Sequence, residues 1–246
     1  MNIMIAGGAG YIGTRLSNVM AKEGHNVTVV DLFWFGDYLL DSINKIKTDI
    51  MDLTIEDLKG FDCVVFMAGL SNDPMANFSP QKNFVENAAT PSYLAYISKK
   101  AGVRRFVYAS SCSVYGFTDN KVMVETDNVS PEYPYGISKL CSYWMTVNFR
   151  ESYSVHASNG ILFNHESPIR GKEFVTRKVT DGVARIKLGL AKKITLGNLE
   201  AKRDWGFAGD FVEAMHMMVQ QKEPGDYVVC TAVQHSIREL LTTAFR

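Results

Sequence analysis

The feature that most constrains this chain is a glycine-rich turn between its first apolar segment and its first amphipathic one. Residues 2–6 are apolar enough for a buried strand, and Gly7, Gly10 and Gly13 follow at once. Glycines at this spacing let the backbone turn tightly and approach a pyrophosphate, whose charge is met by the N-terminus of the next helix. The pattern predicts a strand, turn and helix that bind a dinucleotide, with Tyr11 and Ile12 at the turn.

The second apolar segment, residues 26–31, ends in an acid, Asp31. An acid at this strand end, about 20 residues past the glycines, is placed to accept hydrogen bonds from the ribose hydroxyls of NAD. An arginine would be expected nearby for NADP, and none occurs between Arg15 and Arg104. The sequence therefore predicts NAD as cofactor. The alternative is that Asp31 is only a turn residue that ends the strand.

Short apolar runs alternate with longer amphipathic ones along the first two thirds of the chain. Such alternation predicts an α/β fold of the Rossmann type, a doubly wound parallel sheet with helices on both faces. We expect strands at 2–6, 26–31, 62–68, 103–110 and 155–163, with helices at 11–23, 81–100 and 135–153. Residues 1–163 are predicted to form the NAD-binding domain, and residues 164–246 a small, truncated substrate lobe interleaved with the sheet.

Composition narrows the partners. The 26 basic residues balance 26 acidic ones, so the net charge predicts neither nucleic acid nor an anionic membrane surface as partner. The four cysteines are widely separated and the five histidines show no metal-ligand spacing, so we expect no zinc site, no disulfide framework and no bound metal. No run approaches the 18 apolar residues of a membrane span, which predicts a cytoplasmic chain.

A tyrosine and a lysine four residues apart carry the predicted chemistry. Tyr135 and Lys139 would share one face of a helix, where the ammonium can stabilise the phenolate and let Tyr135 act as a base. The pair follows a strand that ends in small hydroxyl residues, at the sheet edge where folds of this kind bind ligands. The alternative is an ordinary pair on the surface of an amphipathic helix.

In combination these motifs resemble the extended short-chain dehydrogenase/reductase superfamily, specifically its nucleotide-sugar epimerases and dehydratases. The resemblance implies that Ser111, Tyr135 and Lys139 are catalytic, with Ser111 holding the reacting sugar oxygen while Tyr135 takes its proton. It also adds cofactor contacts to the glycine turn and Asp31, namely Asp52, Leu53, Ala68, Gly69 and Asn87.

The second half of the chain is similar to GDP-mannose 4,6-dehydratases in particular. Segments around Asn164, Arg177 and Arg203 carry this likeness, and in that family these positions belong to the nucleotide-sugar site. Arginine suits a diphosphate because its planar fork donates several hydrogen bonds. The resemblance implies a GDP-hexose as substrate and a homodimer that pairs through the helices containing Asn87 and Tyr135. Solvated surface charge is the alternative for the two arginines.

One position departs from the dehydratases. Ser113 stands where they have the glutamate that takes the C5 proton, and C4 epimerases have a small hydroxyl residue there. A serine hydroxyl cannot do that work unaided. We therefore expect a C4 epimerase or oxidoreductase, with Ser113 contacting substrate. Two alternatives stay open. The first is a true dehydratase whose acid comes from elsewhere, for example Glu166, and the second is a shortened, non-catalytic dinucleotide-binding regulator, since relatives continue beyond Arg246.

Overall fold

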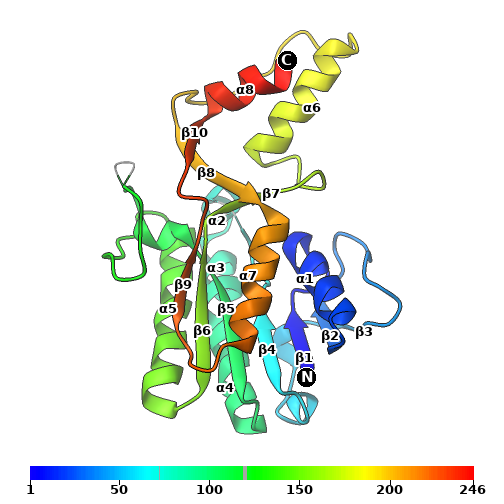
Figure 1. The fold of residues 1–246 in the computed structure, drawn as a ribbon, viewed down its shortest axis with the longest axis vertical. Helices are drawn as coiled ribbons and strands as arrows, with labels where there is room; N and C mark the ends of the chain where they lie inside the picture. The colour runs from blue at the N-terminus through cyan, green and yellow to red at the C-terminus, as the bar shows by residue number, and fades with distance from the viewer. Residues whose placement is uncertain (72, 119–120) are drawn as a thin grey trace.

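A seven-stranded parallel sheet forms the centre of the chain (Figure 1). The structure, a computed structural model, describes residues 1–71, 73–118 and 121–246. Every neighbouring pair of strands in this sheet is parallel. The strand order is β3 (Asn44–Lys47), β2 (Asn26–Asp31), β1 (Asn2–Ala6), β4 (Cys63–Phe66), β5 (Arg105–Ser111), β6 (His156–Leu162) and β9 (Asp226–Val229). The predicted Rossmann-type α/β fold is confirmed.

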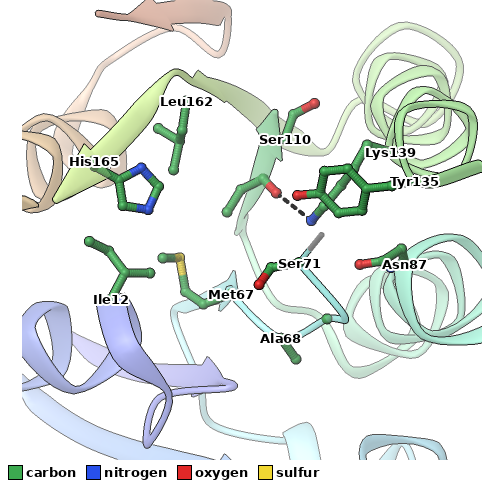
Figure 2. Close-up of a pocket in the computed structure, with 12 residues that line it drawn as sticks. Ile12, Met67, Ala68, Ser71, Asn87, Ser110, Tyr135, Lys139, Leu162 and His165 are labelled. Atoms are coloured by element: carbon green, nitrogen blue, oxygen red, sulfur yellow. Dashed lines mark hydrogen bonds between the residues drawn. The ribbon is translucent and has the colours of Figure 1, made fainter. Parts of the chain in front are cut away.

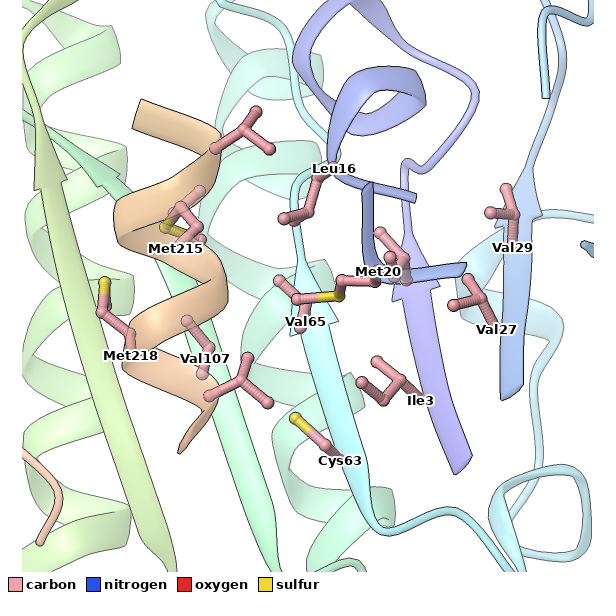
Figure 3. Close-up of a cluster of buried hydrophobic side chains, with 14 of the residues drawn as sticks. Ile3, Leu16, Met20, Val27, Val29, Cys63, Val65, Val107, Met215 and Met218 are labelled. Atoms are coloured by element: carbon pink, nitrogen blue, oxygen red, sulfur yellow. The ribbon is translucent and has the colours of Figure 1, made fainter. Parts of the chain in front are cut away.

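Helices cover both faces of the sheet, because the strands β1, β4 and β5 are apolar on both sides. On one face lie α1 (Tyr11–Lys22) and α7 (Ala208–Gln220), and Leu16, Met215 and Met218 pack there against the sheet (Figure 3). On the other face lie α4 (Thr90–Ala101) and α5 (Pro134–Tyr153), packed around a second buried cluster. Within the described chain, no helix is both long and apolar enough to cross a bilayer.

The helix predicted at 81–100 is interrupted. The structure has α3 (Pro80–Phe84), a π-turn (Val85–Ala89) and then α4. Pro91 gives the reason, since proline has no N–H to donate to the carbonyl four residues earlier, and its ring crowds that carbonyl. That carbonyl belongs to Asn87, and it instead accepts hydrogen bonds from Ser142 Oγ (2.8 Å) and Tyr108 OH (3.3 Å).

The residues after β6 build a smaller lobe above the carboxyl edge of the sheet (Figure 1). Its three-stranded sheet has the order β10 (Gln234–Ser236), β8 (Lys202–Phe207) and β7 (Asn164–Glu166), and it is flanked by α6 (Val175–Lys187) and α8 (Ile237–Phe245). Between β8 and β10 the chain returns to the main sheet through α7 and β9. The division into two units at residue 163 stays a prediction. The remaining elements are α2 (Asp73–Phe78) and the 3₁₀ turns Ile50–Asp52, Glu56–Leu58 and Cys112–Tyr115.

A half-buried ion pair holds the last strand of the main sheet in place. Arg150 donates from both terminal nitrogens to the carboxylate of Asp226, at 3.0 and 2.9 Å, so the pair is bidentate. Asn159 Nδ2 and Tyr143 OH donate to the same carboxylate at 2.8 and 3.0 Å. Burial raises the pKa of Asp226, but the bonds from Arg150 and Asn159 outweigh it and leave the pKa below its usual value. The edge strand β9 is thus fastened to α5 and β6.

Replacing Asp226 with asparagine should lower the free energy of unfolding by about 2–3 kcal/mol, because the half-buried guanidinium of Arg150 would lose its counter-ion. Urea unfolding followed by circular dichroism measures the change. The double variant Asp226→Asn with Arg150→Met should recover part of the loss, because the unpaired charge is gone and an amide oxygen still accepts from Asn159 and Tyr143. An unfolding midpoint for Asp226→Asn equal to that of the parent chain would show that the ion pair does not hold β9.

Candidate active site

The glycine turn after β1 packs closely against the backbone around it. Gly7 has φ +82°, and a Cβ added there would lie 2.4 Å from the backbone nitrogen of Ala68. A Cβ on Gly13 would lie 2.2 Å from the carbonyl oxygen of Gly7. Side chains at either position would push the turn apart. The N-cap residue of α1, Gly10, has no side chain, so the first N–H groups of the helix remain available to an anion.

Asp31 lies at the carboxyl end of β2, close to this turn. Its Oδ2 accepts from the backbone N–H of Ala9 at 3.0 Å, and its Oδ1 accepts from the N–H of Phe33 at 2.8 Å. The carboxylate is therefore held at a fixed place beside the glycine loop. Asp52 and Leu53 follow β3 at the same edge of the sheet, Asp52 exposed and Leu53 buried. The carbonyl of Leu53 accepts from Tyr93 OH at 2.6 Å.

A pocket opens between the carboxyl ends of β4, β5 and β6, and it brings together predicted residues from distant parts of the sequence (Figure 2). Two polar atoms in its wall, Asn87 Oδ1 and Ser110 Oγ, are buried and have no hydrogen-bond partner among the described residues. Such groups are costly to bury unpaired, so they indicate the place of a polar ligand. The lining residues are Ile12, Met67, Ala68, Gly69, Ser71, Asn87, Ala109, Ser110, Tyr135, Lys139, Leu162 and His165.

Tyr135 and Lys139 enter this pocket from the first turns of α5, as the i, i+4 spacing predicts. Pro134 begins the helix, and its missing N–H costs nothing at that position. Lys139 is only 6% exposed, and its Nζ donates to the carbonyl of Ala109 at 3.0 Å. Burial lowers the pKa of Lys139 to about 7. The ammonium is thus poised to change its charge near neutral pH.

The hydroxyls of Ser111 and Ser113 form a pair at the end of β5. Ser111 Oγ donates to Ser113 Oγ at 3.2 Å and accepts from the N–H of Ser113 at the same distance. A 3₁₀ turn starts at Cys112, so the side chains alternate between the two faces of the sheet only as far as Ser111, the last residue of β5. Among the described residues that line the pocket, this segment contributes Ser110 rather than Ser111. The catalytic role of Ser111 stays a prediction.

The predicted substrate residues lie in the lobe, on the other side of β7. Asn164 Nδ2 donates to the carbonyl of Asp204 at 3.2 Å, which ties β7 to β8. Arg177 lines a second pocket, whereas Arg203 is exposed and donates to the carbonyl of Lys202 at 2.7 Å. The second pocket is lined by Glu166, Ser167, Pro168, Thr176, Arg177, Thr180, Trp205, Gly206, Phe207 and Leu240.

His165 is a pocket residue that the sequence analysis left without a role. Figure 2 shows it across the pocket from Tyr135 and Lys139. Its Nδ1 lies 2.8 Å from the carbonyl of Phe163, and burial lowers the pKa of its imidazole to about 4. A neutral ring that donates from Nδ1 presents Nε2 as an acceptor. The sequence could have indicated this position, because His165 follows shortly after β6 and ligands of such folds bind at the carboxyl ends of the strands.

Glu166, the next residue, is placed differently. Its carboxylate accepts from Thr176 Oγ1 at 2.5 Å and lies 3.4 Å from Arg170 Nε, and burial raises its pKa. It lines the second pocket, whereas the pocket of Tyr135 has no carboxylate among the described residues that line it. No three His, Cys, Asp or Glu side chains within the described ranges converge as a metal site requires.

Comparison with known proteins identifies the family. The family model described as GDP-mannose 4,6 dehydratase matches residues 4–246. The chain belongs to this family. It is 35% identical to GDP-mannose 4,6 dehydratase 1 of Arabidopsis thaliana, covering 98% of this chain and 73% of that protein. It is 40% identical to the GDP-mannose 4,6-dehydratase of Vibrio cholerae serotype O1, covering 99% and 70%.

Solved structures show the same fold. UDP-N-acetylglucosamine 4-epimerase from Methanobrevibacter ruminantium M1 has a TM-score of 0.89 at 24% identity, covering 98% of this chain and 80% of that one. MoeE5, in complex with UDP-glucose and NAD, has a TM-score of 0.87 at 25% identity, covering 99% and 81%. The family model and these relatives confirm that the chain is an enzyme of the nucleotide-sugar epimerase and dehydratase group.

The lowered pKa of Lys139 predicts that the stability of the folded chain depends on pH. An unfolded lysine keeps a pKa of about 10.4 and so binds its proton more tightly than the folded chain does. The folded state therefore loses stability as pH falls from about 10 to 7, and below 7 the full penalty is present. Lys139→Met removes the penalty and should raise the melting temperature by several degrees, more at pH 6 than at pH 9.5.

Differential scanning calorimetry at the two pH values measures this difference. Lys22→Met, at an exposed position near the end of α1, is the matched control and should change neither melting temperature. A gain for Lys139→Met that is equal at both pH values would mean that packing, and not charge, causes it.

Proposed function

We propose that the chain binds NAD along the carboxyl edge of the main sheet. The observations that support this are the turn at Gly7 and Gly13, which has no room for a Cβ, and the two orphaned polar atoms in the adjoining pocket. Asp31 would accept hydrogen bonds from the adenosine ribose, and its charge would repel the extra phosphate of NADP. When bound, NAD supplies a hydride acceptor. MoeE5, a structural neighbour at 25% identity, was solved with NAD.

We further propose that the reaction is oxidation of a sugar hydroxyl at C4 of a GDP-linked hexose, with epimerisation at that carbon. Tyr135 takes the hydroxyl proton, and the hydrogen on C4 leaves with its electron pair. Lys139 stabilises the phenolate by its positive charge. Ser111, whose hydroxyl lies at the end of β5, would donate to the sugar oxygen. The reverse steps on the other face of the ketone complete an epimerisation.

The observation that favours reaction at C4 alone is the set of residues that line the pocket of Tyr135. Dehydration needs a base for the C5 proton and an acid for the departing C6 hydroxyl. The described residues of that wall include no carboxylate, and the hydroxyl of Ser113 is bonded to Ser111. Glu166 is engaged by Thr176 and Arg170 in the other pocket. These positions support a C4 oxidoreductase over a dehydratase.

The second pocket supports a nucleotide as the other half of the substrate. Trp205, Phe207 and Arg177 are among the residues that line it. A base packs favourably on aromatic side chains, and a diphosphate suits an arginine. Arg203 lies on the same face of β8 as Trp205 and Phe207, since strand side chains alternate. We propose that Asn164, Arg177 and Arg203 bind the GDP moiety, because the relatives at 35–40% identity are named for GDP-mannose.

A second candidate is GDP-mannose 4,6-dehydratase activity itself. It is favoured by the family match, which spans residues 4–246. In that case a group other than the residue at 113 must serve as base. The two candidates give products of different mass, because only dehydration loses water.

Incubation with NAD and GDP-mannose deuterated at C4 separates the two. We expect a C4 epimer of unchanged mass that keeps its deuterium, detected by chromatography and mass spectrometry, and Tyr135→Phe should slow its formation roughly 100-fold or more. A 4-keto-6-deoxy product from the parent enzyme would discard the C4-only proposal in favour of the dehydratase.

Ser113→Glu tests the role of position 113 directly. Restoring a carboxylate beside Ser111 should create measurable 4-keto-6-deoxy product, because the missing base is then present. Ser113→Gln, equal in size but without the acid, should not form it. If neither variant dehydrates the substrate, the residue at 113 does not decide the outcome.

We also propose a homodimer that pairs through α4 and α5. Their outer faces carry large apolar side chains in the open, including Tyr96 (51% exposed), Ile137 (46%), Trp144 (53%) and Met145 (38%). Ile137, Trp144 and Met145 are seven and eight residues apart on one helix, so they form a single stripe. Apolar stripes of this size on a helix are typical of a protein interface.

Trp144→Glu should convert the dimer to a monomer, because a carboxylate would be buried in the apolar stripe. Light scattering coupled to size-exclusion chromatography measures the mass. Trp34→Glu is the matched control, since Trp34 is 59% exposed in the loop after β2 and lies outside both helices. A parent chain that elutes as a monomer would refute the proposed dimer.

A further inference from the structure

Lys139 holds its charge without a carboxylate partner among the described residues. Its ammonium lies 4.9 Å from the centre of the Tyr108 ring and 5.9 Å from that of Tyr135, and it donates to the carbonyl of Ala109. The described ion pairs do not include Lys139, although the side chain is 6% exposed. A buried ammonium needs some compensation, and here aromatic faces and a carbonyl dipole provide it.

Tyr108 is well fixed for this role. It lies in β5, is fully buried, and packs against Phe66 with ring centres 5.9 Å apart. Its hydroxyl donates to the carbonyl of Asn87, in the π-turn, at 3.3 Å. One side chain therefore contacts both the ammonium of Lys139 and the turn that carries Asn87 into the pocket.

We propose that Tyr108 is a positioning residue for proton transfer: its ring face keeps Lys139 protonated, and its hydroxyl anchors the turn that holds Asn87. The predicted effect of Tyr108 on turnover rests on the proposed function, whereas its effect on the charge of Lys139 does not. Tyr108 contacts Lys139 but is not among the residues that line the pocket, so it acts through its neighbours.

The electrostatics give the direction of the effect. The described titratable groups that face the ammonium are Tyr108 from β5 and Tyr135 from α5, while the π-turn contributes the neutral Asn87 and the loop after β4 contributes Gly69. The negative face of an aromatic ring favours the charged lysine and so opposes the effect of burial. If the face of the Tyr108 ring were less negative, the pKa of Lys139 would be lower and the lysine would lose its proton at lower pH. Tyr135 would then lose its positive neighbour and become less acidic.

A series of fluorinated phenylalanines at position 108 tests the ring without creating a cavity. Each added fluorine weakens the negative face of the ring while its size changes little. The first readout is the pKa of Lys139 itself, from ¹³Cε-lysine NMR of the full chain with Lys139→Arg for assignment. The second is the pH dependence of turnover. The same series at Phe66, a neighbour in the same cluster, is the matched control.

We expect Tyr108→Phe to keep the pKa of Lys139 and to weaken NAD binding a few-fold, because the ring stays while the hydrogen bonds of the hydroxyl to Asn87 and Ser142 are lost. Along the fluorine series the pKa of Lys139 should fall by about one unit in total. The acidic limb of the turnover profile should move to higher pH by a similar amount. The Phe66 series should leave both readouts unchanged.

A pKa of Lys139 that does not vary along the series would overturn the proposal, as would an equal trend at Phe66. The lysine titration needs no substrate. If the trend is present but the parent chain does not act on GDP-mannose, the proposed function fails and the role of Tyr108 in holding the charge stands.

Discussion

The burial of the Lys139 ammonium is the constraint around which the pocket at the carboxyl edge of the sheet is arranged. A charge at this depth is costly, and the surrounding elements each supply part of what it needs. β5 provides a carbonyl at Ala109 and a ring at Tyr108, and α5 provides the ring of Tyr135. Burial lowers the pKa of Lys139 to about 7, so the charge of this side chain responds to pH near neutrality.

Much of the central sheet could be predicted from sequence because its strands are short, apolar and sharply bounded. The strands at 2–6 and 26–31 match β1 and β2 residue for residue, since a glycine turn follows one and an acid ends the other. The predicted helices at 11–23 and 135–153 differ from α1 and α5 by one residue at one end. β3, in contrast, reads Asn-Lys-Ile-Lys and lies at the edge of the sheet, where one side remains in water and no apolar run is needed.

The candidate site likewise has residues that the sequence predicts and others that it does not. Local spacing was enough for Tyr135 and Lys139, which face one pocket because a helix repeats every 3.6 residues. Local spacing was not enough for His165. This residue lies in β7 and reaches the pocket wall only because the fold brings β7 close to residues from distant parts of the sequence. The π-turn was also missed, because the effect of Pro91 falls on a carbonyl four residues away and matters only when Tyr108 and Ser142 lie opposite it.

The path of the chain through β9 has a consequence for how such a protein can diversify. β6 and β9 are neighbours in the sheet, yet most of the lobe lies between them in sequence, and Arg150 and Asp226 close that excursion 76 residues apart. The part of the lobe from β7 to β8 is thus an insert between β6 and α7, while β10 and α8 join the lobe after β9. The loops of this insert can lengthen or change their side chains while the geometry at Tyr135 stays fixed. Among the described residues that line the pocket of Tyr135, His165 alone lies in this insert, so the insert can be remodelled with little change to that pocket.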